Sequence, residues 1–368
     1  MRVDLFCSGS KGNSCLVRTA TTSILIDCGP STKRYMMQSL QSANLTPDTL
    51  DALLITHSHS DHIRQLAMFT QIPIYTCCPL SAKDYKGNPV QLDLHTVARP
   101  SRFVIGDLTI LAVATSHDSG PSMGFVIDDG FEKLVYITDT GYLPAELYPS
   151  LSGADYYIFE SNHDLEMLQQ TNRPFWLKQR IASDTGHMCN ADSSRLLARL
   201  ITPKTRQVVL AHLSEEANTP QLALQAFSER LKLLSWDTSH LVVQAAAQWE
   251  PLHFGSMHPE ENRKTQAEIQ HTPASQKANT IQNGEKSQLI DSSQKKQGIS
   301  NRQTASEIQN RSAQAAWLTE QPGQSSRPQF SGFAFDSSPD EIPEDDFDFE
   351  LPEIPGGLFE SGSSRPLH

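Results

Sequence analysis

The sequence predicts an α/β fold, an αββα sandwich in which two mixed sheets lie between helices, for about residues 1–257. Apolar runs with the spacing of strands alternate with helical periodicity from Met1 to about Pro251, and this pattern then stops. The early part is rich in strands, whereas the later part alternates strand and helix. Several strands end in a histidine or an aspartate, so we expect a site along one edge of the sheets.

Strands are predicted where short apolar runs occur. In chain order they cover residues 2–7, 15–18, 23–27, 51–56, 73–76, 93–97, 102–105, 108–115, 123–128, 133–138, 155–160, 206–211 and 240–245. Helices are predicted where apolar residues recur every three or four positions. They cover residues 31–42, 63–70, 80–85, 144–149, 164–170, 174–182, 190–201 and 220–233.

The most informative segment is residues 56–62, THSHSDH, which directly follows the apolar run at 52–55. His57 and His59 alternate, so they point the same way on an extended strand end. Asp61 and His62 follow on the turn. One pair can hold one metal ion and the other pair a second, because imidazole and carboxylate are preferred metal ligands. Packing alone does not explain such a set.

The order His-x-His-x-Asp-His resembles the signature of the metallo-β-lactamase fold, and the chain is identified as a member of that fold family. Its remaining polar positions are found at later strand ends: His117, Asp139 and His212. Any one of these would be read as a turn cap or a surface residue if it stood alone. The resemblance implies that His57, His59 and His117 hold a first ion, that Asp61, His62 and His212 hold a second, and that Asp139 bridges both.

The resemblance also implies the cofactor and the reaction. A ligand set without cysteine suits Zn or Mn, with Fe as a third candidate, and does not choose among them. Two such ions about 3.5–4 Å apart activate water near neutral pH and take up charge on a phosphoryl or acyl oxygen. Hydrolysis is therefore expected, with Asp61, Asp139 and His187 as catalytic residues.

Further stretches are similar to the YycJ/WalJ group of bacterial hydrolases. They lie at residues 8–14 (SGSKGNS), 24–29 (ILIDCG), 160–164 (ESNHD), 183–187 (SDTGH), 211–214 (AHLS) and 218–220 (NTP), and the similarity covers about residues 1–250. Ser58, Cys7 and Cys28 depart from the pattern, and none of them removes a ligand. This resemblance implies a 5′-3′ exonuclease that acts on DNA and takes part in DNA repair.

Four residues outside the ligand set are predicted to bind substrate: Ser8, Asn13, His163 and His187. His187 follows a turn that can aim it into a cleft, where it would hold a phosphate or protonate a leaving oxygen. The loop at 8–14 would contact phosphate through its N–H groups. The alternatives are surface histidines for His163 and His187, and a plain hairpin turn for the loop.

The net charge and the cysteine content limit how the protein can bind nucleic acid and where in the cell it is expected. A net charge of −12 argues against nucleic-acid binding over the whole protein surface, so a DNA-binding surface should be local. Arg173, Lys178 and Arg180 are candidates for it, with a solvated helix face as the alternative. The six cysteines have no CxxC or disulfide-like spacing, and no apolar run approaches 18 residues. These features predict a cytoplasmic protein without membrane contact.

The chain beyond the hydrolase domain (1–257) is predicted to form two further parts. Residues 258–335 are polar and should be a disordered linker, and residues 336–368 form an acidic and aromatic tail. The tail would dock a replication or repair protein, shield the DNA site, or only aid solubility. Residues 329–333 (QFSGF) loosely resemble a peptide that binds a sliding clamp.

Two other functions stay open. One is a different hydrolase on the same fold, such as a cyclic phosphodiesterase, a thioesterase or a lactonase. The other is a regulatory or scaffold protein that acts through its tail, although a vestigial site should have lost at least one ligand.

Removal of residues 258–368 distinguishes the three roles of the tail. If the tail docks a partner, the truncated protein should digest naked DNA at the full rate and lose its repair function in cells. If it shields the site, digestion should be faster at low salt, and the gain should fade as salt screens the charges. Nuclease rates at several salt concentrations and a repair assay in cells measure both effects. Equality with the full chain in both assays leaves only a solubilising role.

Overall fold

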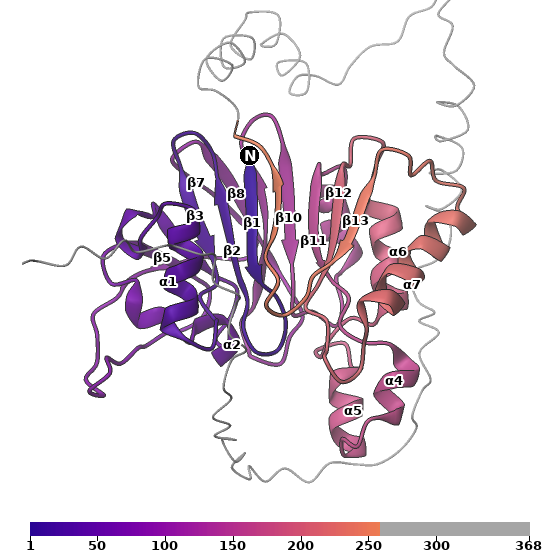
Figure 1. Ribbon diagram of the computed structural model, residues 1–368, viewed down its shortest axis with the longest axis horizontal. Helices are drawn as coiled ribbons and strands as arrows, with labels where there is room; N and C mark the ends of the chain where they lie inside the picture. Colours follow the sequence, from indigo (N-terminus) through magenta and orange to yellow (C-terminus); the bar gives the residue numbers. More distant parts are fainter. Residues whose placement is uncertain (258–368) are drawn as a thin grey trace, which may run out of the picture. The chain divides into compact units, whose positions relative to one another are not determined.

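The computed structural model describes residues 1–257, which form two seven-stranded sheets (Figure 1). The first sheet has the order β14-β1-β2-β3-β4-β5-β6, and the second has the order β13-β12-β11-β10-β9-β8-β7. The strands of the first sheet are β1 (Arg2–Cys7), β2 (Ser14–Arg18), β3 (Ser23–Ile26), β4 (Ala52–Ile55), β5 (Pro73–Thr76), β6 (Asp93–Thr96) and β14 (Leu252–Gly255). Those of the second are β7 (Ser101–Ile105), β8 (Leu108–Ala114), β9 (Met123–Asp128), β10 (Lys133–Ile137), β11 (Tyr156–Glu160), β12 (Gln207–Ala211) and β13 (Val242–Ala245).

The strand directions are alike in the two sheets. Neighbours from β14 to β3 and from β7 to β10 are antiparallel, whereas neighbours from β3 to β6 and from β10 to β13 are parallel. Consequently β1, β3 and β4 end at one edge of the first sheet. In the second sheet β8, β10, β11 and β12 also end at a common edge.

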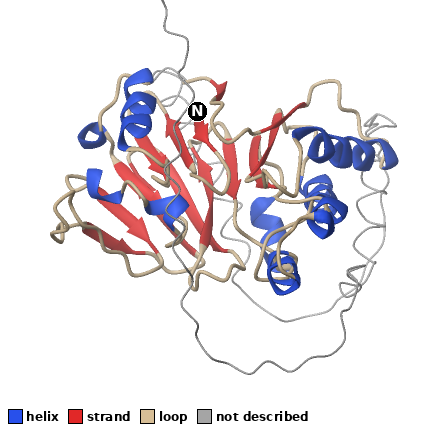
Figure 2. Ribbon diagram, turned by 60° about the horizontal axis from the view of Figure 1, so that its bottom comes forward, coloured by secondary structure: helices blue, strands red, loops and turns tan. Residues whose placement is uncertain are grey.

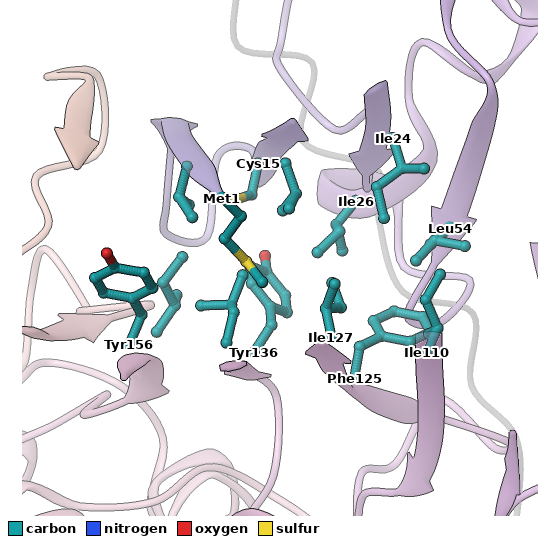
Figure 3. Packing of buried hydrophobic residues seen from close by; sticks show 14 of the residues in the cluster. Met1, Cys15, Ile24, Ile26, Leu54, Ile110, Phe125, Ile127, Tyr136 and Tyr156 are labelled. Carbon is teal, nitrogen blue, oxygen red and sulfur yellow. The ribbon is translucent and has the colours of Figure 1, made fainter. Parts of the chain in front are cut away.

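The main core lies between the sheets, where apolar side chains from both point toward one another (Figure 3). Strand alternation produces this layer, because successive side chains face opposite sides of a sheet. Ile24 and Ile26 of β3 pack inward, whereas Leu25 packs on the outer face. The strand runs are therefore apolar on both faces, as expected for sheets covered on both sides.

Helices cover the outer faces of the sheets (Figure 2). They are α1 (Lys33–Ser42), α2 (Ser60–Ile63), α3 (Tyr148–Leu151), α4 (Leu165–Gln170), α5 (Phe175–Ile181), α6 (Asn190–Leu200) and α7 (Pro220–Leu233), with 3-10 turns at Pro47–Thr49, Leu66–Met68 and Ala145–Leu147. Met36 and Leu40 of α1 pack on the first sheet, and Phe227 of α7 packs on the second. The predicted αββα class is thus confirmed.

Four elements differ from the sequence prediction. The helix predicted at 144–149 is divided into the 3-10 turn at Ala145–Leu147 and α3. The helix predicted at 80–85 is wrong: the Asp84 carboxylate accepts the N–H groups of Lys86 and Asn88, which makes a turn instead. The helix predicted at 63–70 is divided into α2 and the turn at Leu66–Met68. Strand β14 was not predicted, because it is short and gains its identity only from pairing with β1.

The predictions on cysteines and on membrane helices can be compared with residues 1–257, whereas those on the linker and the tail cannot. All six cysteines lie within 1–257, and each is a free thiol. Within this same range no helix is both long and apolar enough to cross a membrane. The predicted linker (258–335) and tail (336–368) lie outside the described residues.

Candidate metal centre

All seven residues predicted as metal ligands come together where the two sheets end. His57 follows β4, His59 precedes α2, and Asp61 and His62 lie within α2. From the second sheet, His117, Asp139 and His212 follow β8, β10 and β12. Hydrogen bonds join the sheets here, since Ser8 Oγ accepts from His212 N at 2.9 Å and Thr56 O accepts from Met123 N at 2.9 Å.

The ligand-capable atoms form overlapping groups. Those of His57, His59 and His117 lie within 4.8 Å of one another, as do those of Asp61, His62 and His212. In the first group the ring centroids are 4.7–4.9 Å apart. These two groups are the sets that the family resemblance assigns to the first and second ion.

Asp139 lies between the two groups. Its Oδ2 is 3.2 Å from His62 Nε2. Its Oδ1 is 3.4 Å from His212 Nε2 and 3.7 Å from His117 Nε2. The two carboxylate oxygens thus face different imidazoles, which is the placement expected of a bridging ligand.

Outer contacts orient the rings from the first sheet. Asp27, which follows β3, accepts a hydrogen bond from His62 Nδ1 at 2.8 Å and from Thr56 N at 2.8 Å. The Thr56 hydroxyl lies 3.0 Å from His57 Nδ1. A carboxylate on Nδ1 places the proton there and turns Nε2 toward the centre, as in many metal-binding histidines.

The rings from the second sheet are oriented in the same manner. His117 Nδ1 donates to the Gly186 carbonyl at 3.1 Å. His212 Nδ1 lies 3.2 Å from Glu160 Oε1, and the same oxygen is 2.8 Å from His187 Nδ1. Glu160 is held in turn by the N–H groups of Thr140 and Met188.

Buried polar atoms in the centre indicate that a metal fits. Among residues 1–257, His57 Nε2, His212 Nε2 and Asp139 Oδ2 are buried and make no hydrogen bond. Buried polar atoms are almost always satisfied, so such a cluster signals a ligand. Imidazole nitrogens and carboxylate oxygens are suitable donors for Zn, Mn or Fe.

The backbone is strained at three positions of this centre. Asp27, Asp139 and His212 adopt left-handed φ values of 59°, 53° and 54°. This region is unfavourable for residues other than glycine and recurs at functional sites. Asp27 and His212 directly follow a strand and Asp139 stands two residues after one, so the unusual φ turns each side chain into the centre.

The charges of the centre depend on one another. Burial raises the pKa of Asp139, but His212 and His62 outweigh this effect and hold that pKa well below its usual value. Burial lowers the pKa of His212, yet Asp139, Asp61 and Glu160 raise it to about 10. The buried carboxylates therefore need positive charge beside them, which protonated imidazoles or divalent ions supply.

Three of the four predicted substrate-binding residues, Ser8, Asn13 and His187, contact residues of the centre. Ser8 and Asn13 are buried in the β1–β2 hairpin, and the Asn13 amide lies 3.2 Å from Asp61 Oδ2 and 3.0 Å from His62 Nε2. His163 is 1% exposed, so the surface-loop alternative is wrong for it. The His187 side chain is 20% exposed and lies 4.0 Å from Asp139 Oδ1. Their contact with substrate stays a prediction.

Sequence reasoning did not select Asp27, Thr56 or Glu160 as site residues. Asp27 and Glu160 stand at or directly after the ends of apolar strands, as the predicted ligands do. The same strand-end pattern would have found both. No sequence pattern marks Thr56 as a site residue, because its role in orienting the histidines depends on the nearby Asp27.

Comparisons with known proteins agree with the motif. A family model described as a beta-lactamase superfamily domain matches residues 22–213, a range that includes all seven predicted ligands. The exodeoxyribonuclease YycJ of Bacillus anthracis is 32% identical over 243 residues, covering 63% of this chain and 89% of YycJ. The exodeoxyribonuclease WalJ of Streptococcus pneumoniae is 34% identical over 231 residues, covering 60% of this chain and 85% of WalJ. The metallo-beta-lactamase fold protein YhfI from Bacillus subtilis superposes with a TM-score of 0.47 at 18% identity, covering 69% of this chain and 98% of YhfI.

Substitution of Gly29 should disturb the turn that carries Asp61. A Cβ at Gly29 would lie 1.5 Å from the Asp61 carbonyl oxygen, so one backbone must move. We expect Gly29→Ala to lower the free energy of unfolding by about 1–3 kcal/mol, the usual cost of overpacking. Denaturant unfolding measures this, with Ser31→Ala as a control that should stay within about 0.5 kcal/mol. Equal midpoints for Gly29→Ala and the unsubstituted chain would contradict the close packing.

Proposed function

Because this chain belongs to the metallo-β-lactamase superfamily, and within it to the group of YycJ and WalJ, we propose that it is an exonuclease that hydrolyses DNA from a 5′ end in DNA repair. It is a metal-dependent hydrolase. The observation that carries the proposal is the position of Asp139 between two groups of imidazoles, where His57 Nε2, His212 Nε2 and Asp139 Oδ2 are buried and make no hydrogen bond. The names of both sequence relatives support DNA as the substrate.

We assign the centre to two divalent ions, Zn or Mn, with Fe as a third candidate. His57, His59 and His117 would hold the first ion. Asp61, His62 and His212 would hold the second, and Asp139 would contact both. The outer contacts of His62, His117 and His212 support this assignment, because each ring has its other nitrogen anchored.

Bound divalent ions supply an activated water and stabilise negative charge on the phosphate. The protein's own residues set the geometry for this chemistry. Asp61 and Asp139 act as catalytic residues: Asp139 contacts histidines of both ligand groups, and Asp61 contacts His62 and His212 of the second. Glu160 orients His187 through Nδ1, which leaves Nε2 of the partly exposed ring for substrate. His187 can there bind a phosphate oxygen or protonate the leaving oxygen.

A nuclease assay tests the proposed function. Single- and double-stranded DNA labelled at the 5′ or the 3′ end would be incubated with the full chain, with and without Mn or Zn. The proposal predicts metal-dependent release of nucleotides from the 5′ end. Bis-p-nitrophenyl phosphate, a thioester and a lactone serve as comparison substrates. Turnover of the thioester or lactone with no digestion of DNA or RNA would contradict the proposed nuclease function. Digestion of RNA alone would show that the substrate is RNA and not DNA.

Asp139→Ala should lower metal content and activity together. The substitution removes the carboxylate shared by the two groups, so metal content should fall from two ions per chain to below one. Activity should fall by more than the roughly 10–100-fold typical of an outer contact. Elemental analysis of protein purified without chelator measures the first effect. Asp93→Ala, at an exposed aspartate of β6, is the matched control and should bind two ions. Well under two equivalents in the unsubstituted chain, even after Mn or Zn is offered, would contradict the assignment.

His187→Ala should lower turnover without releasing metal. The ligand set is complete without this residue, so metal content should stay at two ions per chain. Turnover should fall by about 10²–10⁴, the usual contribution of a positioned acid or base. His95→Ala, at a half-exposed histidine of β6, controls for loss of an imidazole and should leave turnover unchanged. A parallel fall in metal content would show that His187 is a ligand instead.

A further inference from the structure

Helix α5 lies at the rim of the candidate metal centre. Its last residue, Ile181, accepts a hydrogen bond from His187 N at 2.8 Å. Its Arg180 donates to the Asp118 carboxylate. Asp118 Oδ1 is 3.8 Å from His59 Nε2 and 3.9 Å from His117 Nε2. In Figure 1, α4 and α5 lie beyond the same end of the sheets as α2, which carries Asp61 and His62.

The helical spacing of α5 determines which residues share the side of Arg180. Leu177 and Ile181 form the inner side, where they pack with Leu168 and Ala217. Trp176 precedes Arg180 by four residues, so the two side chains lie on the same flank, about 6 Å apart along the axis. Trp176 therefore stands one helical turn from a residue that contacts the rim of the centre.

The exposure of Trp176 is unusual for so large an apolar group. Its surface is 55% exposed, and that of the neighbouring Phe175 is 56% exposed. Burial of a large apolar side chain contributes about 1.5–3 kcal/mol, which the fold leaves largely unused here. Exposed aromatic rings beside a nuclease centre are typical of surfaces that stack nucleobases of a single strand.

The positive charge near α5 supports the binding of a DNA strand less strongly than the exposed aromatic ring does. Residues 172–183 include Arg173, Lys178 and Arg180 and no acidic residue, in a chain of net charge −12. Arg173 is paired with Glu216, however, and Arg180 with Asp118. Part of this positive charge is therefore already neutralised, so stacking should contribute more to binding than the local charge does.

We propose that Trp176 is a stacking platform for a nucleobase of a single-stranded DNA end whose phosphodiester lies in the metal centre. This inference rests on the proposed nuclease function and adds the part of the substrate that is recognised. A flat ring recognises any base, so sequence-independent binding is expected. Arg180, one turn away, would face the sugar-phosphate backbone between the stacked base and the centre.

Steady-state kinetics of the full, metal-loaded chain test the platform. Trp176→Ala should raise KM for single-stranded DNA by about 5- to 100-fold, the usual effect of losing one stacked base. It should leave turnover of bis-p-nitrophenyl phosphate unchanged, because that diester carries no base. Trp176→Phe should restore most of the affinity. Tyr85→Ala removes a 92% exposed aromatic ring from the β5–β6 loop and should change neither substrate.

Oligonucleotides with one abasic site separate stacking from a general structural effect. The abasic site would be moved through the first few nucleotides from the 5′ end. At one position it should raise KM for the unsubstituted chain and have no further effect on Trp176→Ala. Additive effects at every position, or an unchanged KM in Trp176→Ala, would overturn the inference while the nuclease function stands. A chain that digests no DNA under any metal condition would overturn the proposed function itself.

Discussion

The contacts of the Asp139 carboxylate are the interaction on which the rest of the site depends. Its two oxygens face imidazoles that come from different sheets, with His62 on one side and His212 and His117 on the other. A buried carboxylate is costly unless positive charge stands beside it. The groups around Asp139 can satisfy this need with protons or with divalent ions. In both cases Asp139 links residues of the two sheets at this edge.

The ligand side chains are held in position by residues that hydrogen-bond to them from outside the centre. Asp27 and Glu160 each end a buried strand, and each anchors one ring nitrogen of a histidine. Ser8 ties the hairpin of the first sheet to the backbone of His212 in the second. Because these partners are buried in regular structure, the inward nitrogens have little freedom to move. The left-handed φ values at the ends of β3, β10 and β12 belong to the same arrangement.

The two sheets make different contributions to the site. The first sheet supplies the compact His57–His62 segment, which is held beneath the turn at Gly29. The second supplies separate ligands and also the long segment after β11, which carries His187 and α5. That segment reaches the centre through Gly186 and Arg180. Ion binding would therefore depend on both sheets.

The sequence by itself determined every strand except β14 and most helices, because these follow from local spacing. It also determined the set of seven candidate ligands, through the resemblance of its histidine motif and later strand ends to a known fold family. Only the tertiary structure decided which groups stand behind the ligands. Asp27 and Glu160 became visible as orienting residues once distant strands were paired, and Asn13 was placed inside the centre by the hairpin. Strand β14 and the turn at Asp84 depend on pairing and on side chain to backbone hydrogen bonds that local periodicity does not encode. The position of α5 at the rim was likewise fixed by a tertiary contact, because its Arg180 donates to Asp118, 62 residues earlier in the chain.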